Sequence, residues 1–154
     1  MRERTPEHVY KLLTRLASNS GPFYWVMMLP IVSASRRPMY VGYAFYNREV
    51  PGVVPRHLNV VARACKDQWL VLNITTGNEG EGRTFTGRDW RKIDRPSRVA
   101  ASQARLVSPR DLRALRDGYL MQETEDCPPL LVKAMLVEFL SSTRGNKQLK
   151  NSCI

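Results

Sequence analysis

The sequence predicts an α+β domain, with a small antiparallel sheet and flanking helices. Its length of 154 residues fits one domain by the usual size of roughly 100–200 residues. Two runs rich in β-forming residues, one around Val60 and one over residues 69–74, lie on either side of the polar tetrapeptide 65–68, which is typical of a β-hairpin. The last third of the chain changes to helical patterns that open with proline.

The elements expected before the hairpin are one helix and two strands. Thr5-Pro6-Glu7 supplies a capping hydroxyl, a proline for the first turn and an acid, which predicts an N-terminal helix over residues 5–18. Residues 23–29 are aromatic and β-favouring and predict a central strand. Residues 39–46 predict a second strand, with a bend at Gly42.

After the hairpin, residues 77–87 contain four glycines, which predicts a mobile loop without regular structure. Further strands are expected at residues 96–100 and 104–107, so that the sheet region spans about residues 22–107. Two helices are expected over about residues 108–143, with Ser108 as the cap of the first. The polar tail 144–154 is expected to be frayed.

The two ends of the hairpin carry the best candidates for chemistry. Arg56-His57 precedes the first strand and Thr75-Thr76 ends the second. Because the start of one antiparallel strand lies beside the end of its partner, these four residues should meet at one end of the sheet. A guanidinium, an imidazole and two hydroxyls would form a site for an anion or a phosphate. The alternative is that Arg56 and His57 are solvated edge residues and that the threonines only end the strand.

The charge balance indicates a polyanionic partner. The chain has 24 Lys and Arg against 14 Asp and Glu, a net charge of +10, and residues 83–116 alone carry +7. Arginine suits phosphate, so nucleic acid is the simplest partner; a merely soluble basic protein is the alternative. The residues that we expect to contact RNA are Arg83, Arg88, Trp90, Arg91, Lys92, Arg95, Ser97 and Arg98. Trp90 would stack on unpaired bases, unless its ring is packed in the core.

Cysteine usage and hydropathy limit the remaining classes. Cys65, Cys127 and Cys153 form no CxxC motif, and with only two histidines the chain does not supply an evident set of four zinc ligands. We therefore expect no metal and no cofactor, and reduced thiols in a cytoplasmic protein. The longest apolar run, residues 23–32, contains Pro30 and is too short to span a membrane, and the N-terminus is too polar for a secretory signal.

Three stretches of the chain resemble the toxin ribonucleases of the MazF/PemK type. RHLNVV at residues 56–61 is similar to that family's basic residue before a Val-Val strand, and LVLNITT at residues 70–76 is similar to its strand ending in a hydroxyl pair. RPSRV at residues 95–99, with the helical pattern that follows, is similar to its last strand and C-terminal half. The N-terminal helix departs from the family pattern, as does Arg-His in place of the usual Arg-Pro.

The resemblance implies a small SH3-like antiparallel β-barrel and a metal-independent endoribonuclease that cleaves single-stranded RNA. It implies that Arg56 and Thr75 bind the scissile phosphate, with Thr76 beside them and Ser97 and Arg98 on the other wall. The reference pKa of histidine is near 6.5, so His57 suits acid–base work. The partners implied are RNA, an acidic antitoxin protein and a second copy of the chain, and no membrane.

Three other functions remain open at this stage, and one of them is an inactive scaffold of the toxin fold whose helices form a homodimer. A basic module of this kind can bind nucleic acid without cutting it. It can also be a phage- or virus-encoded inhibitor that docks on an acidic surface of a partner protein. Cleavage products would distinguish the enzyme from a binder, and binding that weakens steeply with salt would favour the nucleic-acid binder.

Overall fold

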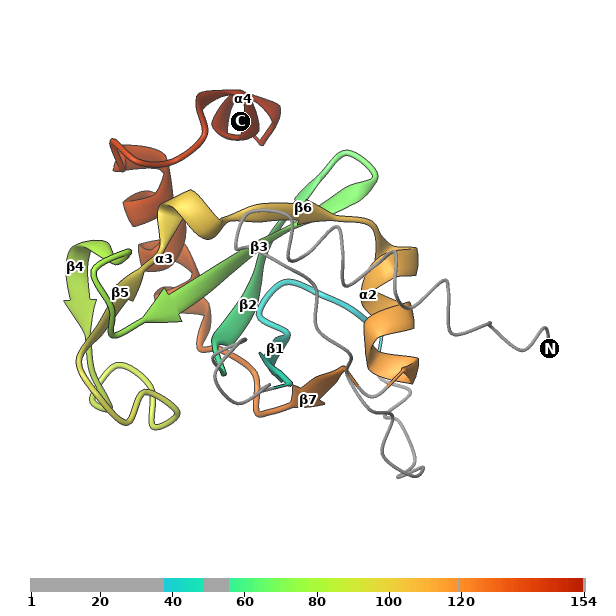
Figure 1. The fold of residues 1–154 in the computed structure, drawn as a ribbon, viewed down its shortest axis with the longest axis horizontal. Helices are drawn as coiled ribbons and strands as arrows, with labels where there is room; N and C mark the ends of the chain where they lie inside the picture. Colours follow the sequence, from blue (N-terminus) through green and yellow to red (C-terminus); the bar gives the residue numbers. More distant parts are fainter. Residues whose placement is uncertain (1–37, 49–55, 119, 154) are drawn as a thin grey trace, which may run out of the picture.

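The computed structural model describes residues 38–48, 56–118 and 120–153, which form an antiparallel sheet with helices packed against it (Figure 1). The α+β class predicted from the sequence is confirmed. The helix predicted over residues 5–18 and the strand predicted over residues 23–29 lie outside the described residues.

The centre of the sheet is the predicted hairpin, formed by β2 (Leu58–Cys65) and β3 (Gln68–Thr75). The two strands are antiparallel, and Lys66 and Asp67 form the turn between them. A register shift just after Val61 interrupts the pairing. The polar tetrapeptide therefore marks the turn correctly, because it separates two strands that are mostly buried away from the turn.

The remaining strands are short. They are β1 (Ala44–Asn47), β4 (Glu81–Phe85), β5 (Ser97–Val99), β6 (Arg105–Val107) and β7 (Met121–Glu123). Their order across the sheet is β4-β5-β3-β2-β1-β7, and β6 also pairs with β3, beyond a single 3-10 turn that separates it from β5. Across the described residues β4 and β7 are the two edges, so the sheet is open and not closed into a barrel.

Three of the predicted strands are present as β1, β5 and β6, each shorter than expected. Gly42 lies in a turn before β1 with a φ of +95°, a backbone conformation that favours glycine. The expectation that residues 77–87 hold no regular element is wrong, because they contain β4. Neither β4 nor β7 shows a clear hydrophobic alternation; each is an edge strand held by backbone pairing to one neighbour.

Two helices cover opposite faces of the central hairpin. On one face α2 (Pro109–Asp117) packs Leu112 and Leu115 against the β2 and β3 residues Val61 and Val71. As predicted, the Ser108 side chain caps this helix by accepting a hydrogen bond from the backbone N–H of Asp111.

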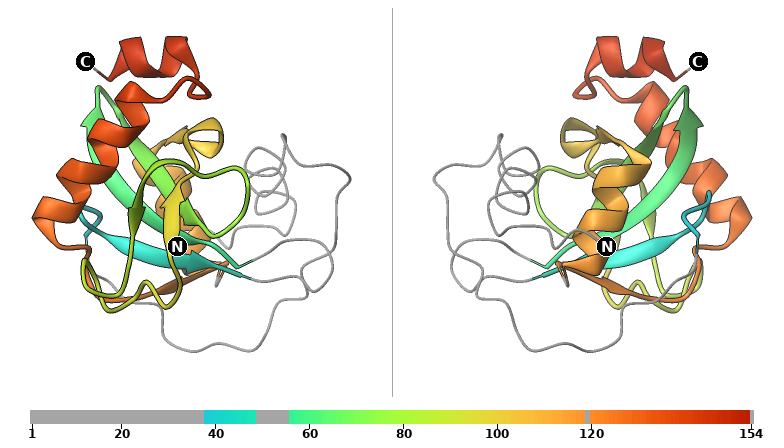
Figure 2. Two further views of the ribbon diagram at one scale, coloured as in Figure 1. Left: turned by 90° about the vertical axis from the view of Figure 1, so that its left-hand side faces the viewer. Right: turned by 90° about the vertical axis from the view of Figure 1, so that its right-hand side faces the viewer.

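The other face of the hairpin is covered by α3 (Pro129–Ser141), whose Met135 and Phe139 are fully buried. They join Val60 and Leu72, the neighbours of Val61 and Val71 in the chain, in a second and larger cluster. Alternate residues of each strand thus serve separate cores, which is how a two-sided sheet buries both faces. The ribbons in Figure 2 show α2 and α3 with the hairpin between them.

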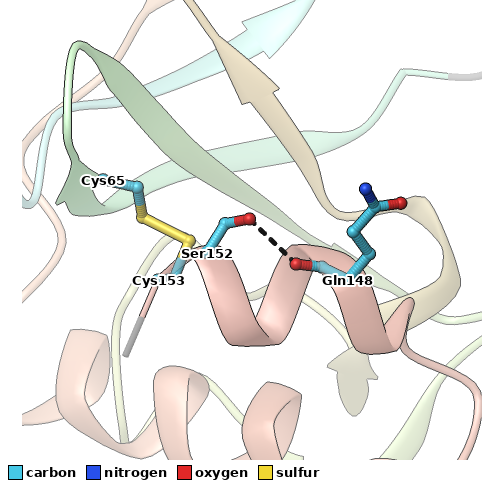
Figure 3. The surroundings of a disulfide bond; sticks show 4 residues. All are labelled: Cys65, Gln148, Ser152 and Cys153. Atoms are coloured by element: carbon cyan, nitrogen blue, oxygen red, sulfur yellow. Dashed lines mark hydrogen bonds between the residues drawn. A yellow bond between two sulfur atoms is a disulfide. The ribbon is translucent and has the colours of Figure 1, made fainter.

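The tail after Arg144 is ordered, in contrast with the frayed end that its polarity predicts. Residues Lys147–Ser152 form α4, and Asn146 caps it by accepting hydrogen bonds from the N–H groups of Gln148 and Leu149. Cys153, directly after the helix, forms a disulfide with Cys65 at the tip of the β2–β3 hairpin, with the two Cα atoms 5.0 Å apart (Figure 3). The cross-link fixes a segment whose own sequence has little apolar surface to bury.

The expectation of reduced thiols is therefore wrong for two of the three cysteines, and only Cys127 is a free, buried thiol. Disulfides form mainly in oxidising compartments. The cysteines therefore no longer support the cytoplasmic location, which stays a prediction. Within the described ranges, none of the helices has the length and apolarity that crossing a bilayer requires.

Candidate functional site

A polar surface pocket of about 530 Å³ lies at the end of the hairpin where β3 stops. Its walls come from the turn after β3, from β4 and β5, and from the segment after α3. It is lined by Thr75, Thr76, Gly77, Asn78, Gly80, Thr84, Pro96, Arg98 and Arg144. This lining holds two guanidinium groups and three threonines but no carboxylate, so the pocket suits an anion.

The turn after β3 is folded around the side chain of Thr75. The Thr75 hydroxyl oxygen accepts a hydrogen bond of 3.0 Å from the backbone N–H of Gly77, and the N–H of Gly80 donates to the carbonyl of Gly77. Gly80 lies so close to β5 that a Cβ at this position would stand 2.7 Å from the Cβ of Arg98. A larger residue at position 80 would push this wall outward and change the shape of the pocket.

Two arginines from distant parts of the chain complete the walls. Arg98 on β5 is directly opposite Thr75 in the sheet, and its Nε donates to the Thr84 hydroxyl at 3.2 Å. Arg144 follows α3, and its Nη1 donates to the carbonyl oxygen of Asn78 at 2.7 Å. Each guanidinium has five N–H donors, so both keep donors that can bind a ligand.

His57 belongs to the same face of the sheet as Thr75. Leu58 is paired with Ile74, and continuing this register by one residue brings His57 beside Thr75, which is itself paired with Arg98. The residues His57, Thr75 and Arg98 thus form a row, with His57 just before β2, Thr75 at the end of β3 and Arg98 on β5. On β1, Asn47 extends the row, because its Oδ1 accepts a hydrogen bond from the His57 N–H at 2.9 Å.

The environment of His57 favours its neutral form. Burial lowers the pKa of His57 below its ordinary value of 6.5; Glu79 opposes that shift, and Arg105 adds to it. A neutral imidazole at pH 7 can accept a proton from a reacting hydroxyl group. His57 is near the pocket but does not line it.

Arg56 is separated from the other three predicted catalytic residues. Its guanidinium lies 4.1 Å above the ring of Tyr46, and its Nη2 donates to the side chain of Gln122 at 3.1 Å. Tyr46 packs on the core cluster that lies beneath α3, whereas His57 lies on the other face. The four residues expected to converge thus divide: Thr75 and Thr76 line the pocket, His57 adjoins it, and Arg56 points elsewhere.

Among the residues predicted to bind RNA, Arg98 alone lines the pocket. Arg83 pairs with Asp89 at 3.0 Å, and Arg91 forms a bidentate ion pair with Glu125. Ser97 is buried, and its hydroxyl donates to the carbonyl of Arg95 at 2.7 Å. Within the part of the chain that the structure describes, the side chains of Arg88, Lys92 and Arg95 form no ion pair.

Trp90 is a core residue. It is 4% exposed, packs in the cluster beneath α3, and donates its indole N–H to Glu125 at 3.1 Å. Of the two placements that the sequence allows, the buried one is correct, so the ring is not a platform on which bases can stack. Its polar edge is satisfied by a carboxylate that Arg91 also binds.

Sequence reasoning missed Arg144 and Arg105. Arg144 lies in the tail expected to be frayed, and only the tertiary fold brings it 66 residues back along the chain to Asn78. Arg105 lies in the basic segment 83–116, but the sequence does not show that it is near His57, because this depends on the pairing of β6 with β3. No local sequence signal marks either residue.

Within the described ranges, no group of three or more His, Cys, Asp and Glu residues is arranged to hold a metal ion. No protein-family model, curated protein or solved structure matches this chain. Any functional conclusion therefore depends on the geometry and charge of the site.

Proposed function

We propose that the protein binds single-stranded RNA and holds one backbone phosphate in the pocket between Arg98 and Arg144. The observation that carries this proposal is the lining itself, which combines two guanidinium groups with threonine hydroxyls and lacks a carboxylate. Hydrogen bonds from arginine to phosphate are charge-assisted and often bidentate, which makes them stronger than neutral ones. The chain's net charge of +10 draws a polyanion towards this surface.

The Thr75 side chain supports the same proposal. Its oxygen already accepts the Gly77 N–H, and a hydroxyl group has one hydrogen to donate as well. Within the described residues that hydrogen has no protein acceptor, so a phosphate oxygen in the pocket can accept it. Of the basic side chains without an ion pair there, Arg95 directly precedes the pocket residue Pro96 and can contact a neighbouring phosphate.

The test measures the affinity for a short fluorescent single-stranded RNA at several salt concentrations. Arg98→Ala and Arg144→Ala should each weaken binding by about tenfold or more, since hydrogen bonds to charged groups contribute about 1.5–3 kcal/mol. Each variant should also reduce the slope of log affinity against log salt by about 0.7, the value for one phosphate contact on a single strand.

Arg63→Ala is the matched control for this test. Arg63 is exposed and lies towards the opposite end of the hairpin, paired with Leu70. The substitution removes the same charge at a distance from the pocket: Leu70 lies about 16 Å from Thr75 along β3, at roughly 3.3 Å per residue. If Arg98→Ala and Arg144→Ala do no more than Arg63→Ala, the pocket is not the phosphate site.

A second candidate function is metal-independent cleavage of the bound RNA, and the placement of His57 in one row with Thr75 and Arg98 favours it. In this reaction the 2′-oxygen forms a bond to phosphorus and the bond from phosphorus to the 5′-oxygen breaks. The 2′-hydroxyl proton passes to His57, and the leaving oxygen takes a proton from water. Arg98 and Thr75 would stabilise the charge that develops on phosphorus oxygens.

Cleavage should produce 2′,3′-cyclic phosphate ends in the presence of EDTA and should be lost in His57→Gln. The rate should rise with pH to a plateau, and its midpoint should lie below pH 6.5, because the base must be neutral and burial lowers the pKa of His57 beneath its ordinary 6.5. RNA that is bound but stays intact, or a His57→Gln variant as active as the parent, would leave only the binding function.

The toxin-type identity, the SH3-like barrel, the antitoxin partner and the homodimer remain proposals from the sequence resemblance. Across the described residues the sheet is open, so the barrel rests on that resemblance alone. Arg56 lies against Tyr46 and Gln122, away from the pocket. One residue of the active site that the resemblance implies is therefore not at this site.

A further inference from the structure

A carboxylate from β4 organises the segment that carries Arg144. Glu81 accepts hydrogen bonds from the Ser142 hydroxyl at 2.8 Å, from the Thr143 N–H at 3.1 Å and from the Thr143 hydroxyl at 2.9 Å. These donors lower the pKa of Glu81 to about 2, with the Ser142 hydroxyl as the largest cause. Glu81 is therefore charged throughout the neutral range.

The same contacts continue into the pocket wall. The Ser142 hydroxyl oxygen accepts hydrogen bonds from the N–H groups of Arg144 and Gly145, at 3.0 and 3.2 Å. Arg144 then reaches across to the carbonyl of Asn78 in the turn after β3. One network thus runs from Glu81, which does not itself line the pocket, to a guanidinium that does.

The position of Glu81 opposes the simplest electrostatics. Ser142 is the C-cap of α3, and the C-terminal end of a helix carries partial negative charge that disfavours a carboxylate. A carboxylate beside an anion pocket also repels the ligand. The three hydrogen bonds donated to Glu81 offset both unfavourable interactions. They also hold the turn between α3 and Arg144 in one conformation.

We propose that Glu81 is a positioning residue for phosphate binding, which holds the Ser142–Arg144 turn so that the Arg144 guanidinium stays at the pocket. This proposal depends on the proposed RNA-binding function. It makes a prediction with an unusual sign: neutralising an acid near an anion site should weaken anion binding.

The experiment compares Glu81→Gln with Glu79→Gln in the RNA-binding assay, after thermal unfolding shows that both variants are folded at the assay temperature. Glu79 is an exposed acid in the turn after β3 and does not line the pocket. Removing its charge should leave affinity unchanged or raise it. Glu81→Gln should instead lower affinity about tenfold, as expected for loss of one charge-assisted contact.

Two further measurements separate positioning from a general loss of structure. Thr143→Val removes one donor to Glu81 from an exposed position and keeps the carboxylate, so it should weaken binding in the same direction. In the Glu81→Gln background, Arg144→Ala should cost less than about twofold, because coupled residues are strongly non-additive.

The outcomes distinguish this inference from the binding function. If Arg144→Ala weakens binding while Glu81→Gln and Thr143→Val bind as tightly as the parent, the positioning role is overturned and the pocket remains. If Arg144→Ala itself has no effect, the phosphate pocket is wrong and the positioning role fails with it.

Discussion

Lys66 occupies the turn of the central hairpin with a φ of 53°, the one non-glycine residue with a positive φ within the described ranges. An L-residue in this left-handed region is strained by about 1–2 kcal/mol. Lys66 is the first residue of a two-residue turn, and it needs this conformation to reverse the chain between Cys65 and Gln68. The sequence marks a turn here, but it does not show which residue bears the strain.

We expect Lys66→Gly to raise the free energy of unfolding by about 0.5–1 kcal/mol, because glycine removes the strain at some cost in unfolded-state entropy. Chemical denaturation measures this change. Asp67→Gly is the matched control: its φ is not positive, so glycine there should lower stability. If the two variants shift stability equally, the hairpin turn has a different geometry.

At the scale of single side chains, the site also shows why a residue pattern can mislead. Arg56 and His57 are neighbours in the chain, and successive residues of an extended strand point to opposite faces. His57 therefore adjoins the pocket, whereas Arg56 stacks on Tyr46 beneath the other face. The alternation of faces in an extended segment therefore separates Arg56 from His57, and this period of two was readable from the sequence.

Among the elements, α4 depends most on a bond outside itself. It has six residues, none of them buried, and an isolated helix of this length is not stable in water. The Cys65–Cys153 disulfide and the contact between the Lys150 ammonium and the Ser142 carbonyl hold it against the body of the domain. The cysteine positions alone gave three possible pairings, so the sequence did not identify this one.

Reducing the disulfide should destabilise the protein. The bond closes a loop with a sequence separation of 88, which corresponds to about 4–5 kcal/mol in the chain-entropy model. We expect dithiothreitol to lower the melting temperature, with no effect of the reductant on a Cys65→Ser/Cys153→Ser variant.

Thiol labelling provides the direct check of the same bond. The unfolded, unreduced protein should react at Cys127 alone, and reduction should expose all three thiols. Three reactive thiols before reduction would show that the disulfide is not formed.

Strand β4 forms through backbone pairing, although its side chains show no strand pattern. Its first four residues are not buried, and only Phe85 at its end is. It forms because β5 offers a free edge for hydrogen bonding. Glu81 and Thr84 are placed beside the pocket by this pairing.

At the scale of the molecule, the pocket lies at one end of the central hairpin, whose two faces are covered by α3 and α2. It opens where β3 ends, beside β4, β5 and the segment after α3. The basic segment 83–116 contributes one arginine, Arg98, to the pocket lining. Three of its other arginines form ion pairs: Arg83 with Asp89, Arg91 with Glu125 and Arg116 with Asp117. A high local charge in the sequence is thus an unreliable guide to which cations line the pocket.

Sequence patterns alone were enough to predict the α+β class, the central hairpin, the helices α2 and α3, and the threonine pair at the end of β3. These features depend on local patterns: residue periodicity, turn composition, and proline or serine at helix starts. Tertiary structure alone decided that Arg144 and not Arg56 faces those threonines, that Trp90 is buried, and that Cys65 pairs with Cys153. Each of these depends on contacts between segments far apart in the chain. Those segments come together because they pack on a shared core, which no single segment of the sequence specifies.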